Sequence, residues 1–133
     1  MIKRTYPIHI RFNDLDSLGH VNNAVYLSYF EQGRMEYFSE LGGENWDWTQ
    51  EGTLLARNEI DYKVPIFLQD KVRIEIWVSD IGNKSFSVNY RIVKDTDGKD
   101  IECTAGKSIM VCFDYKTQKS IPVPEKWREK FGE

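Results

Sequence analysis

Apolar and polar residues alternate along residues 6–12. The apolar phase of this segment consists of Tyr6, Ile8, Ile10 and Phe12. A period of two is typical of a strand with one buried face, so we expect a strand here. A polar turn over residues 13–20 ends this strand, and Asn22 or Asn23 is a suitable N-cap for the element that follows.

The pattern changes to a helical period between residues 24 and 41. Residues that recur three or four positions apart are Tyr26, Phe30, Gly33, Tyr37 and Leu41. Further apolar residues occupy the other faces, which predicts a long buried helix. Gly33 in its middle costs on the order of 1 kcal/mol relative to alanine, and we expect close approach of a sheet to compensate. The pair Gly42-Gly43 is a stop signal for this helix.

The rest of the chain alternates as four strands joined by short turns. In each strand, alternate positions are mostly apolar and share one face; these positions lie within residues 56–64, 72–78, 86–92 and 103–113. In the last strand this phase consists of Cys103, Ala105, Ile109, Val111 and Phe113. The pair Asp97-Gly98 is a hairpin signal, and Pro122 and Pro124 are expected to end the regular structure.

Short turns make neighbouring strands antiparallel, so one helix on one antiparallel sheet predicts an α+β architecture. No repeat or linker divides the sequence, and residues 1–133 are expected to form a single domain. One helix cannot cover a five-stranded sheet. We therefore expect the free edge and face to contact a second subunit, in a homodimer or a homotetramer.

Composition narrows the range of functions. The net charge is −3, with no basic run, so a general nucleic-acid binder is not expected. The two cysteines, Cys103 and Cys112, are not in a CxxC pair, and too few histidines accompany them to predict a metal site. No continuous apolar stretch predicts a signal peptide or a membrane span, so a cytoplasmic location is expected.

The segment over residues 13–23 concentrates ionisable and amide side chains where a strand ends and a buried helix begins. It holds Asp14, Asp16, His20, Asn22 and Asn23. Free N–H groups at a helix start stabilise developing negative charge, and a neighbouring carboxylate can act on a carbonyl or a water. This combination suits acyl transfer. The same residue types are ordinary turn formers, so the residues alone leave a capped turn and a catalytic site as alternatives.

The stretch Asp14-Leu15-Asp16-Ser17-Leu18-Gly19-His20-Val21-Asn22-Asn23 resembles the N-terminal signature of hot-dog-fold acyl-CoA thioesterases of the 4-hydroxybenzoyl-CoA thioesterase type. The aromatic-rich helix with Glu31 and Arg34 and the four-strand meander extend the resemblance over nearly the whole chain. The resemblance implies a hot-dog fold, in which an antiparallel sheet of about five strands wraps round one long helix. It also implies hydrolysis of an acyl-CoA to free acid and CoA, without a cofactor.

The resemblance further implies roles for individual residues. Asp16 corresponds to the catalytic carboxylate, as nucleophile or general base, and the backbone N–H of Asn23 corresponds to the oxyanion donor. Lys84 and Ser85 match a basic segment that meets the phosphates of CoA. His20 is a further candidate, either catalytic or a hydrogen-bonding residue at the helix start.

Two other functions stay open at this point. Plant-type acyl-carrier-protein thioesterases carry a similar stretch with an asparagine where this chain has Leu18. A hot-dog domain that binds acyl-CoA without hydrolysing it is the second alternative. On the helix, Glu31 and Arg34 are expected to pair. Trp46 and Trp48 are expected to pack beneath a loop or to line an acyl pocket.

Overall fold

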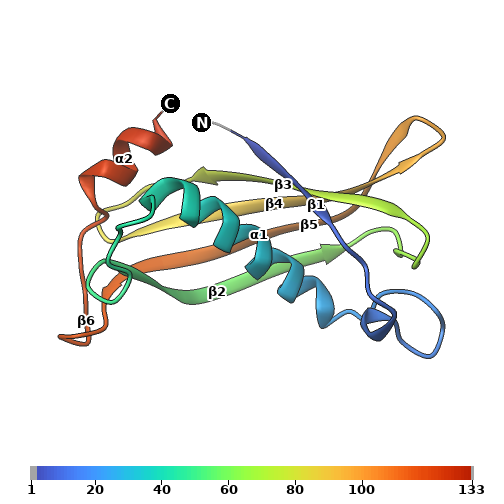
Figure 1. Cartoon of the computed structure of the whole chain (residues 1–133), viewed down its shortest axis with the longest axis horizontal. Helices are drawn as coiled ribbons and strands as arrows, with labels where there is room; N and C mark the ends of the chain where they lie inside the picture. The colour runs from blue at the N-terminus through green and yellow to red at the C-terminus, as the bar shows by residue number, and fades with distance from the viewer. Residues whose placement is uncertain (1–2, 133) are drawn as a thin grey trace.

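The structure is a computed structural model that describes residues 3–132. Its elements in chain order are β1 (Arg4–Ile8), the 3-10 turn η1 (Phe12–Asp14), α1 (Val25–Gly42), β2 (Gly52–Tyr62), β3 (Lys71–Ser79), β4 (Ser85–Thr96), β5 (Lys99–Asp114), β6 (Lys119–Ser120) and α2 (Glu125–Phe131). One sheet has the strand order β1-β3-β4-β5-β2, and the short β6 pairs with β5 (Figure 1). The expected α+β architecture is confirmed.

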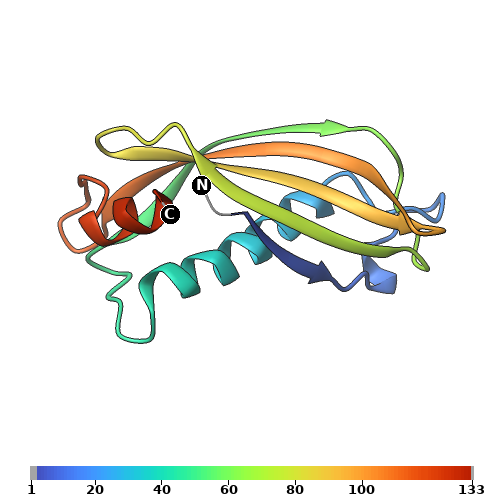
Figure 2. The same ribbon diagram turned by 90° about the horizontal axis from the view of Figure 1, so that it is seen from above.

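The sheet curves over α1, which lies along one of its faces (Figure 2). All neighbouring strands are antiparallel. Strands β1 and β2 are the two ends of the strand order, so β2 is an edge strand. No helix within residues 3–132 is both long and apolar enough to cross a membrane.

Contacts between α1 and the sheet explain the glycine in the middle of the helix. A Cβ added at Gly33 would lie 2.6 Å from Cδ1 of Ile76 on β3, so any other residue here would have to displace that side chain. The Phe30 ring stacks on that of Tyr90, with ring centroids 4.1 Å apart. The expected close packing of helix on sheet at Gly33 is therefore confirmed.

The first strand is shorter than expected. It ends at Ile8, and Phe12 opens η1 with 77% of its surface exposed. The cause is local hydrogen bonding, because the N–H of Asp14 donates to the carbonyl of Arg11 at 2.9 Å. The Asp14 carboxylate in turn accepts the Arg11 N–H at 2.9 Å. Because of these bonds the strand ends at Ile8, although the alternating pattern of the sequence continues to Phe12.

The start of α1 also differs from the expectation, whereas its end does not. The helix begins at Val25, and Ala24 occupies the N-cap position. Asn22 lies two residues earlier, and its Oδ1 accepts the N–H of Ala24 at 2.9 Å. At the other end the N–H of Gly43, at a φ of 76°, donates to Ser39. The glycine stop is confirmed.

The expectation that Pro122 and Pro124 end the regular structure is wrong. Pro124 precedes α2, and its carbonyl accepts the N–H of Trp127 at 3.0 Å. Proline is tolerated at a helix start, because the first N–H groups of a helix have no intrahelical acceptor. Trp127 and Phe131, four positions apart, are buried. The helix α2 that carries them lies at one end of the sheet (Figure 1).

The two long C-terminal strands form the expected hairpin at Asp97 and Gly98, which have φ values of 53° and 77°. The buried face of β5 is not the phase that its apolar pattern marks. The residues of β5 that are buried are Cys103, Thr104, Ser108, Met110 and Cys112. Apart from Cys103, the apolar phase is only half-buried on the opposite face, because polar residues fill part of the core-facing side.

Candidate functional site

The motif over residues 13–23 folds back on itself between η1 and α1. Leu15 pairs with Val21 in an isolated antiparallel bridge, and the N–H of Asp16 donates to the carbonyl of His20 at 2.9 Å. Gly19 closes the turn at a φ of 85°, a conformation that favours glycine. The sequence therefore forms a small, defined loop at the point where α1 begins.

Backbone contacts fix this loop to the segment that follows β2. The N–H of Val21 donates to the carbonyl of Ile66 at 2.8 Å. His20 forms a bridge with Phe67, and the two rings meet edge to face with centroids 6.2 Å apart. The loop is thus held by the connection between β2 and β3 and not only by its own chain ends.

Asp14 is a buried anchor of the loop, with a side chain only 3% exposed. Besides the N–H of Arg11, its carboxylate accepts the Tyr29 hydroxyl at 2.8 Å and approaches the Arg11 guanidinium at 3.3 Å. Burial by itself raises the pKa of Asp14, but these donors together outweigh burial and lower that pKa below its ordinary value. Asp14 ties the motif to α1 through Tyr29.

Asp16 and His20 lie side by side on the loop surface. Oδ2 of Asp16 is 3.2 Å from Nδ1 of His20, and the two side chains are 27% and 29% exposed. Oδ1 of Asp16 accepts the N–H of Leu18 at 2.9 Å. A carboxylate is therefore oriented by the loop backbone, touches an imidazole and stays accessible to a ligand.

Asn23 borders a small pocket of about 180 Å³ beside this pair. Within residues 3–132, the backbone N–H of Asn23 donates to no protein acceptor. Its carbonyl accepts the hydroxyl of Tyr62 at 2.8 Å. His20, Tyr26 and Tyr62 line the same pocket. A free backbone donor, an imidazole and two aromatic rings thus share one concave surface.

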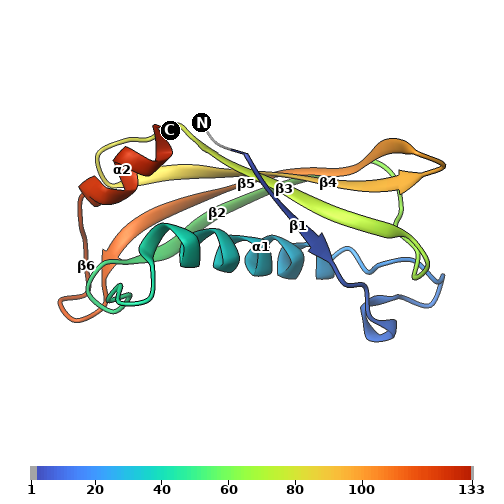
Figure 3. The same ribbon diagram turned by 45° about the horizontal axis from the view of Figure 1, so that its top comes forward.

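The structure does not bring Lys84 and Ser85 to this pocket. Ser85 opens β4, whereas Lys94 near its other end donates to the carbonyl of Pro65 in the segment that holds the loop. Nine residues of strand separate these positions, or about 30 Å at ~3.3 Å per residue. Lys84 is exposed, with Nζ 3.5 Å from Oγ of Ser120. The start of β4, which follows Lys84, lies at the opposite end of the sheet from the motif loop (Figure 3).

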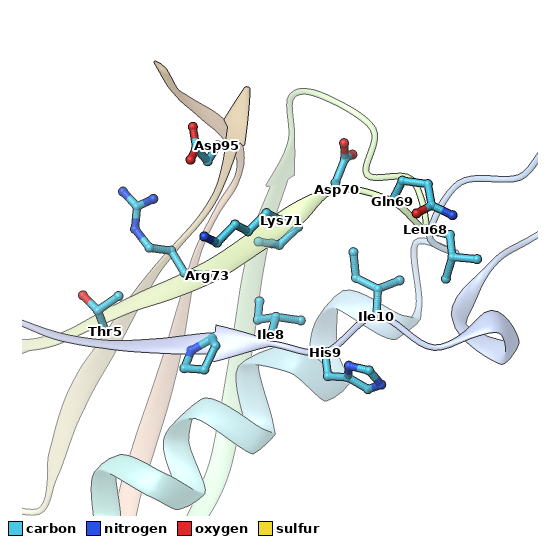
Figure 4. A pocket seen from close by; sticks show the side chains of 12 residues that line it. Thr5, Ile8, His9, Ile10, Leu68, Gln69, Asp70, Lys71, Arg73 and Asp95 are labelled. Carbon is cyan, nitrogen blue, oxygen red and sulfur yellow. The ribbon is translucent and has the colours of Figure 1, made fainter. Parts of the chain in front are cut away.

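A second hollow, of about 720 Å³, lies between β1 and the start of β3 (Figure 4). Two of its charged residues already have partners: Asp70 pairs with Lys94 at 3.2 Å, and Arg73 pairs with Asp100 at 2.7 Å. None of the residues that line it belongs to the motif over residues 13–23. We therefore assign it no part in the chemistry.

The expected pairing of Glu31 with Arg34 is wrong. Arg34 is buried and donates from Nη1 to the hydroxyl of Tyr90 at 3.0 Å and to Ser108 at 3.4 Å. Glu31 is exposed on the surface of α1. The guanidinium can be buried because hydroxyl groups on β4 and β5 accept its hydrogen bonds. Sequence reasoning also missed Tyr62, which the alternation marked only as a strand residue.

Comparisons with known proteins agree with the fold and the motif. Residues 10–131 match the model of the thioesterase-like superfamily. A solved thioesterase from Thermus thermophilus, complexed with coenzyme A and Zn, is 33% identical with a TM-score of 0.80, over 96% of this chain and 95% of that one. The long-chain acyl-CoA thioesterase FadM of Escherichia coli is 28% identical over 124 residues, 92% of each chain.

The 4-hydroxybenzoyl-CoA thioesterase of Pseudomonas sp. strain CBS-3 shares the fold, with a TM-score of 0.83 at 21% identity over 96% of this chain and 97% of that one. The architecture is thus the hot-dog fold. The chain belongs to the thioesterase-like superfamily, and the resemblance stated from the sequence is confirmed.

Proposed function

We propose that this protein hydrolyses an acyl-CoA thioester to a free acid and CoA at the pocket beside Asp16, His20 and Asn23. The observation that carries the proposal is an accessible, oriented carboxylate in contact with His20, which lines the same pocket as Asn23, whose backbone N–H has no protein acceptor among the described residues. The family membership and the names of the relatives support the same class of reaction.

The pocket supplies stabilisation for the charge that develops in acyl transfer. The N–H of Asn23 points from the turn that opens α1, where the helix dipole favours negative charge. A thioester carbonyl that accepts this N–H is polarised, and the oxyanion of the tetrahedral intermediate is stabilised further. The bond from Tyr62 to the Asn23 carbonyl fixes the orientation of this peptide segment.

Asp16 acts in one of two ways, as a nucleophile or as a general base, and the atoms balance in both reactions. As a nucleophile, its carboxylate displaces the CoA thiolate to form a mixed anhydride, which water then hydrolyses. As a general base, it accepts a proton from the water that attacks the thioester carbon, and the thiolate leaves. In both cases His20 holds the carboxylate from one side through Nδ1. Single-turnover hydrolysis in heavy-oxygen water tests for the nucleophile route, because only that route, with water attacking the aspartyl carbonyl of the anhydride, places solvent oxygen in Asp16.

A second copy of the chain completes this site. The outer edge of β2 pairs with no strand in the described part of the chain, and Leu54, Leu55 and Tyr62 on it are between 41% and 46% exposed. An exposed edge strand of this length is a template for pairing. Antiparallel pairing of two β2 strands about Arg57 joins Tyr62 of one copy to Gly52 of the other.

This pairing also accounts for Lys84. Gly52 is opposite Phe113 on β5, and the neighbouring Cys112 donates its N–H to the Lys84 carbonyl at 2.8 Å. Lys84 therefore lies at the Gly52 end of its own chain, which the pairing brings to the Asn23 end of the other. The proposed site takes Asp16 and Asn23 from one copy and Lys84 and Ser85 from the other, in a homodimer or a homotetramer of such dimers.

A thiol-release screen over a panel of acyl-CoA esters tests the function, with Asp16→Asn as the matched variant. The variant keeps the size and the hydrogen-bonding shape of the side chain but removes its charge. We expect kcat to fall by ~10²–10⁴ with the fold intact. Each acyl group is also presented on acyl carrier protein, and faster turnover there would favour the carrier-protein alternative. Ligand binding without thiol release from any ester would contradict the proposed hydrolysis.

A further inference from the structure

Lys94 is a charged residue at a core-facing position of β4. The other residues in the same alternating phase of this strand are buried and hydrophobic: Phe86, Val88, Tyr90 and Ile92. The Lys94 side chain is itself only 11% exposed. A buried ammonium costs stability unless close partners replace its lost hydration. The partners of Lys94 therefore indicate what a cation at this position does for the protein.

The Lys94 ammonium has three partners, and all three belong to the connection between β2 and β3. Nζ donates to the carbonyl of Pro65 at 3.1 Å and to Oδ2 of Asp70 at 3.2 Å. It also lies 5.6 Å from the centroid of the Phe67 ring, within the range of a cation–π contact. The same Oδ2 of Asp70 accepts the N–H of Phe67 at 2.8 Å. Lys94 thus fixes the backbone of this connection at two points and one of its rings.

The same connection forms one wall of the Asn23 pocket, because its residues 63–65 line that pocket. The carbonyl of Cys103 on β5 accepts the N–H groups of the first two of these residues, at 2.9 and 3.1 Å. Lys94 holds the third through its carbonyl. The pocket wall is therefore attached to the sheet by a backbone carbonyl and by the one buried ammonium of β4.

Phe67 links Lys94 to the side chains of the proposed reaction. Its ring contacts the Lys94 ammonium and also meets the His20 ring edge to face, with centroids 6.2 Å apart. Nδ1 of His20 is in turn 3.2 Å from Oδ2 of Asp16. A continuous series of contacts therefore runs from a buried cation of the sheet to the exposed carboxylate of the loop.

We propose that Lys94 is a positioning residue for the proposed hydrolysis, because its ammonium fixes both the wall of the Asn23 pocket and the ring of His20. The inference rests on the proposed function and adds to it a residue that acts through others. Lys94 reaches the site only through Pro65 and Phe67. Loss of its ammonium lowers the rate through geometry, since a misplacement of about 1 Å can cost about 10²-fold.

Lys94→Met tests the proposal, because methionine keeps an unbranched apolar side chain but removes the charge and the donors. On the ester that the wild type hydrolyses fastest, we expect kcat to fall by about 10–100-fold. KM should change by less than about threefold, because the proposed phosphate contact at Lys84 is untouched. A general loss of CoA binding would raise KM instead.

Arg73→Met is the matched control. Arg73 lies on β3, three residues after Asp70, and it pairs with Glu75 and Asp100. In the described part of the chain neither of these carboxylates is hydrogen-bonded to the connection that Lys94 holds. The control removes a cation with two carboxylate partners from the neighbouring strand. It should leave kcat and KM unchanged.

The NMR signals of the His20 ring give a readout that does not depend on activity. The chain has two histidines, His9 and His20, so the His9→Gln variant assigns their signals. Lys94→Met should shift the His20 ring signals, because the Phe67 ring that they contact changes its position. Arg73→Met should leave them in place. A merely structural role for Lys94 would lower the free energy of unfolding but change neither kcat nor the His20 signals of the folded protein.

A second variant is used if Lys94→Met does not fold, since that substitution leaves the Asp70 carboxylate without its cation. Lys94→Met combined with Asp70→Asn removes both charges and keeps an oxygen for the Phe67 N–H. It should show the same fall in kcat and the same shift of the His20 signals. If the wild type releases thiol but a folded variant keeps wild-type kcat or unmoved His20 signals, the role of Lys94 is overturned alone. No thiol release by the wild type from any ester would overturn the proposed function instead.

Discussion

Replacement of Asp14 by asparagine should separate the two carboxylates of the motif, because it removes the buried anchor and leaves the exposed one. The Asp14 carboxylate accepts from two donors at 2.8–2.9 Å and lies 3.3 Å from a guanidinium. Both donors bond the same oxygen, Oδ2, whereas Oδ1 faces the Arg11 guanidinium. An asparagine that places its oxygen at the Oδ2 position keeps both bonds but turns its NH₂ toward the guanidinium, so the ion pair and the charge that strengthens all three contacts are lost. This loss costs about 1–3 kcal/mol of unfolding free energy.

Urea unfolding followed by tryptophan fluorescence measures this loss, and thiol release under saturating substrate measures kcat. We expect Asp14→Asn to be less stable by the stated amount and to keep kcat within a few fold, because Asp16 has its own contacts to Leu18 and His20. Asp16→Asn, the control, should show the reverse. An Asp14→Asn variant with wild-type stability but a kcat lower by more than about 10² would refute the reasoning and exchange the two roles.

The stability difference between wild type and Asp14→Asn, measured at low pH, gives an independent check of this role for Asp14. The pKa of Asp14 is lowered in the folded state, although burial, the largest single influence, opposes the shift. The unfolded chain therefore binds this proton more tightly than the folded one. The stabilisation by Asp14 is fully present above its unfolded pKa of about 3.9 and is lost as the pH falls through the folded pKa. The stability difference between wild type and Asp14→Asn should narrow below about pH 4, and a constant difference would contradict this account.

Two further predictions follow from the proposed assembly. Lys84→Ala should raise KM for CoA esters and leave kcat unchanged, since a phosphate contact acts on ground state and transition state alike, and the effect should shrink at high salt; an unchanged KM at low salt would count against this assignment. Sedimentation velocity at micromolar concentration should show a dimer or a larger species, and a fully active monomer would exclude a site shared between copies.

Local patterns in the sequence were sufficient to predict the main elements of the fold. The period of three to four residues around Gly33 predicted α1, and Asp97-Gly98 predicted the hairpin, since both depend on neighbours in the chain. The short helix α2 was missed because two prolines precede it. The spacing of Trp127 and Phe131, one helical turn apart and both buried, is the signal that could have found it.

Part of the candidate site could likewise be predicted from the sequence, and part of it could not. The loop with Asp16, His20 and Asn23 is continuous in sequence, so a motif could identify it. Tyr62 reaches the Asn23 carbonyl only because β2 returns past the start of α1, and no local pattern marks it. The position of Lys84 at the far end of the sheet depends on strand direction and register, which a motif does not contain.

The inner face of β5 shows most clearly why periodicity failed there, and it also bears on the site. Thr104 and Ser108 are fully buried, which a hydrophobic pattern does not anticipate. Ser108 accepts from Tyr90 and Arg34 and donates to Oδ1 of Asn58 on β2 at 2.5 Å. A buried guanidinium is costly unless its donors are satisfied, and networks of this kind favour one arrangement of the elements they join.

Here the network joins α1, β4, β5 and β2, and it crosses β2 near its centre. On one side of that point the Tyr62 hydroxyl donates to the carbonyl of Asn23, and on the other side Gly52 and Thr53 line a hollow of about 370 Å³ beside the C-terminal half of α1. A shift of β2 along β5 would displace both ends together. The polar residues that obscured the strand pattern thus join β2 to β5 and, through Arg34, to α1, and this contact bears on the register of the edge strand.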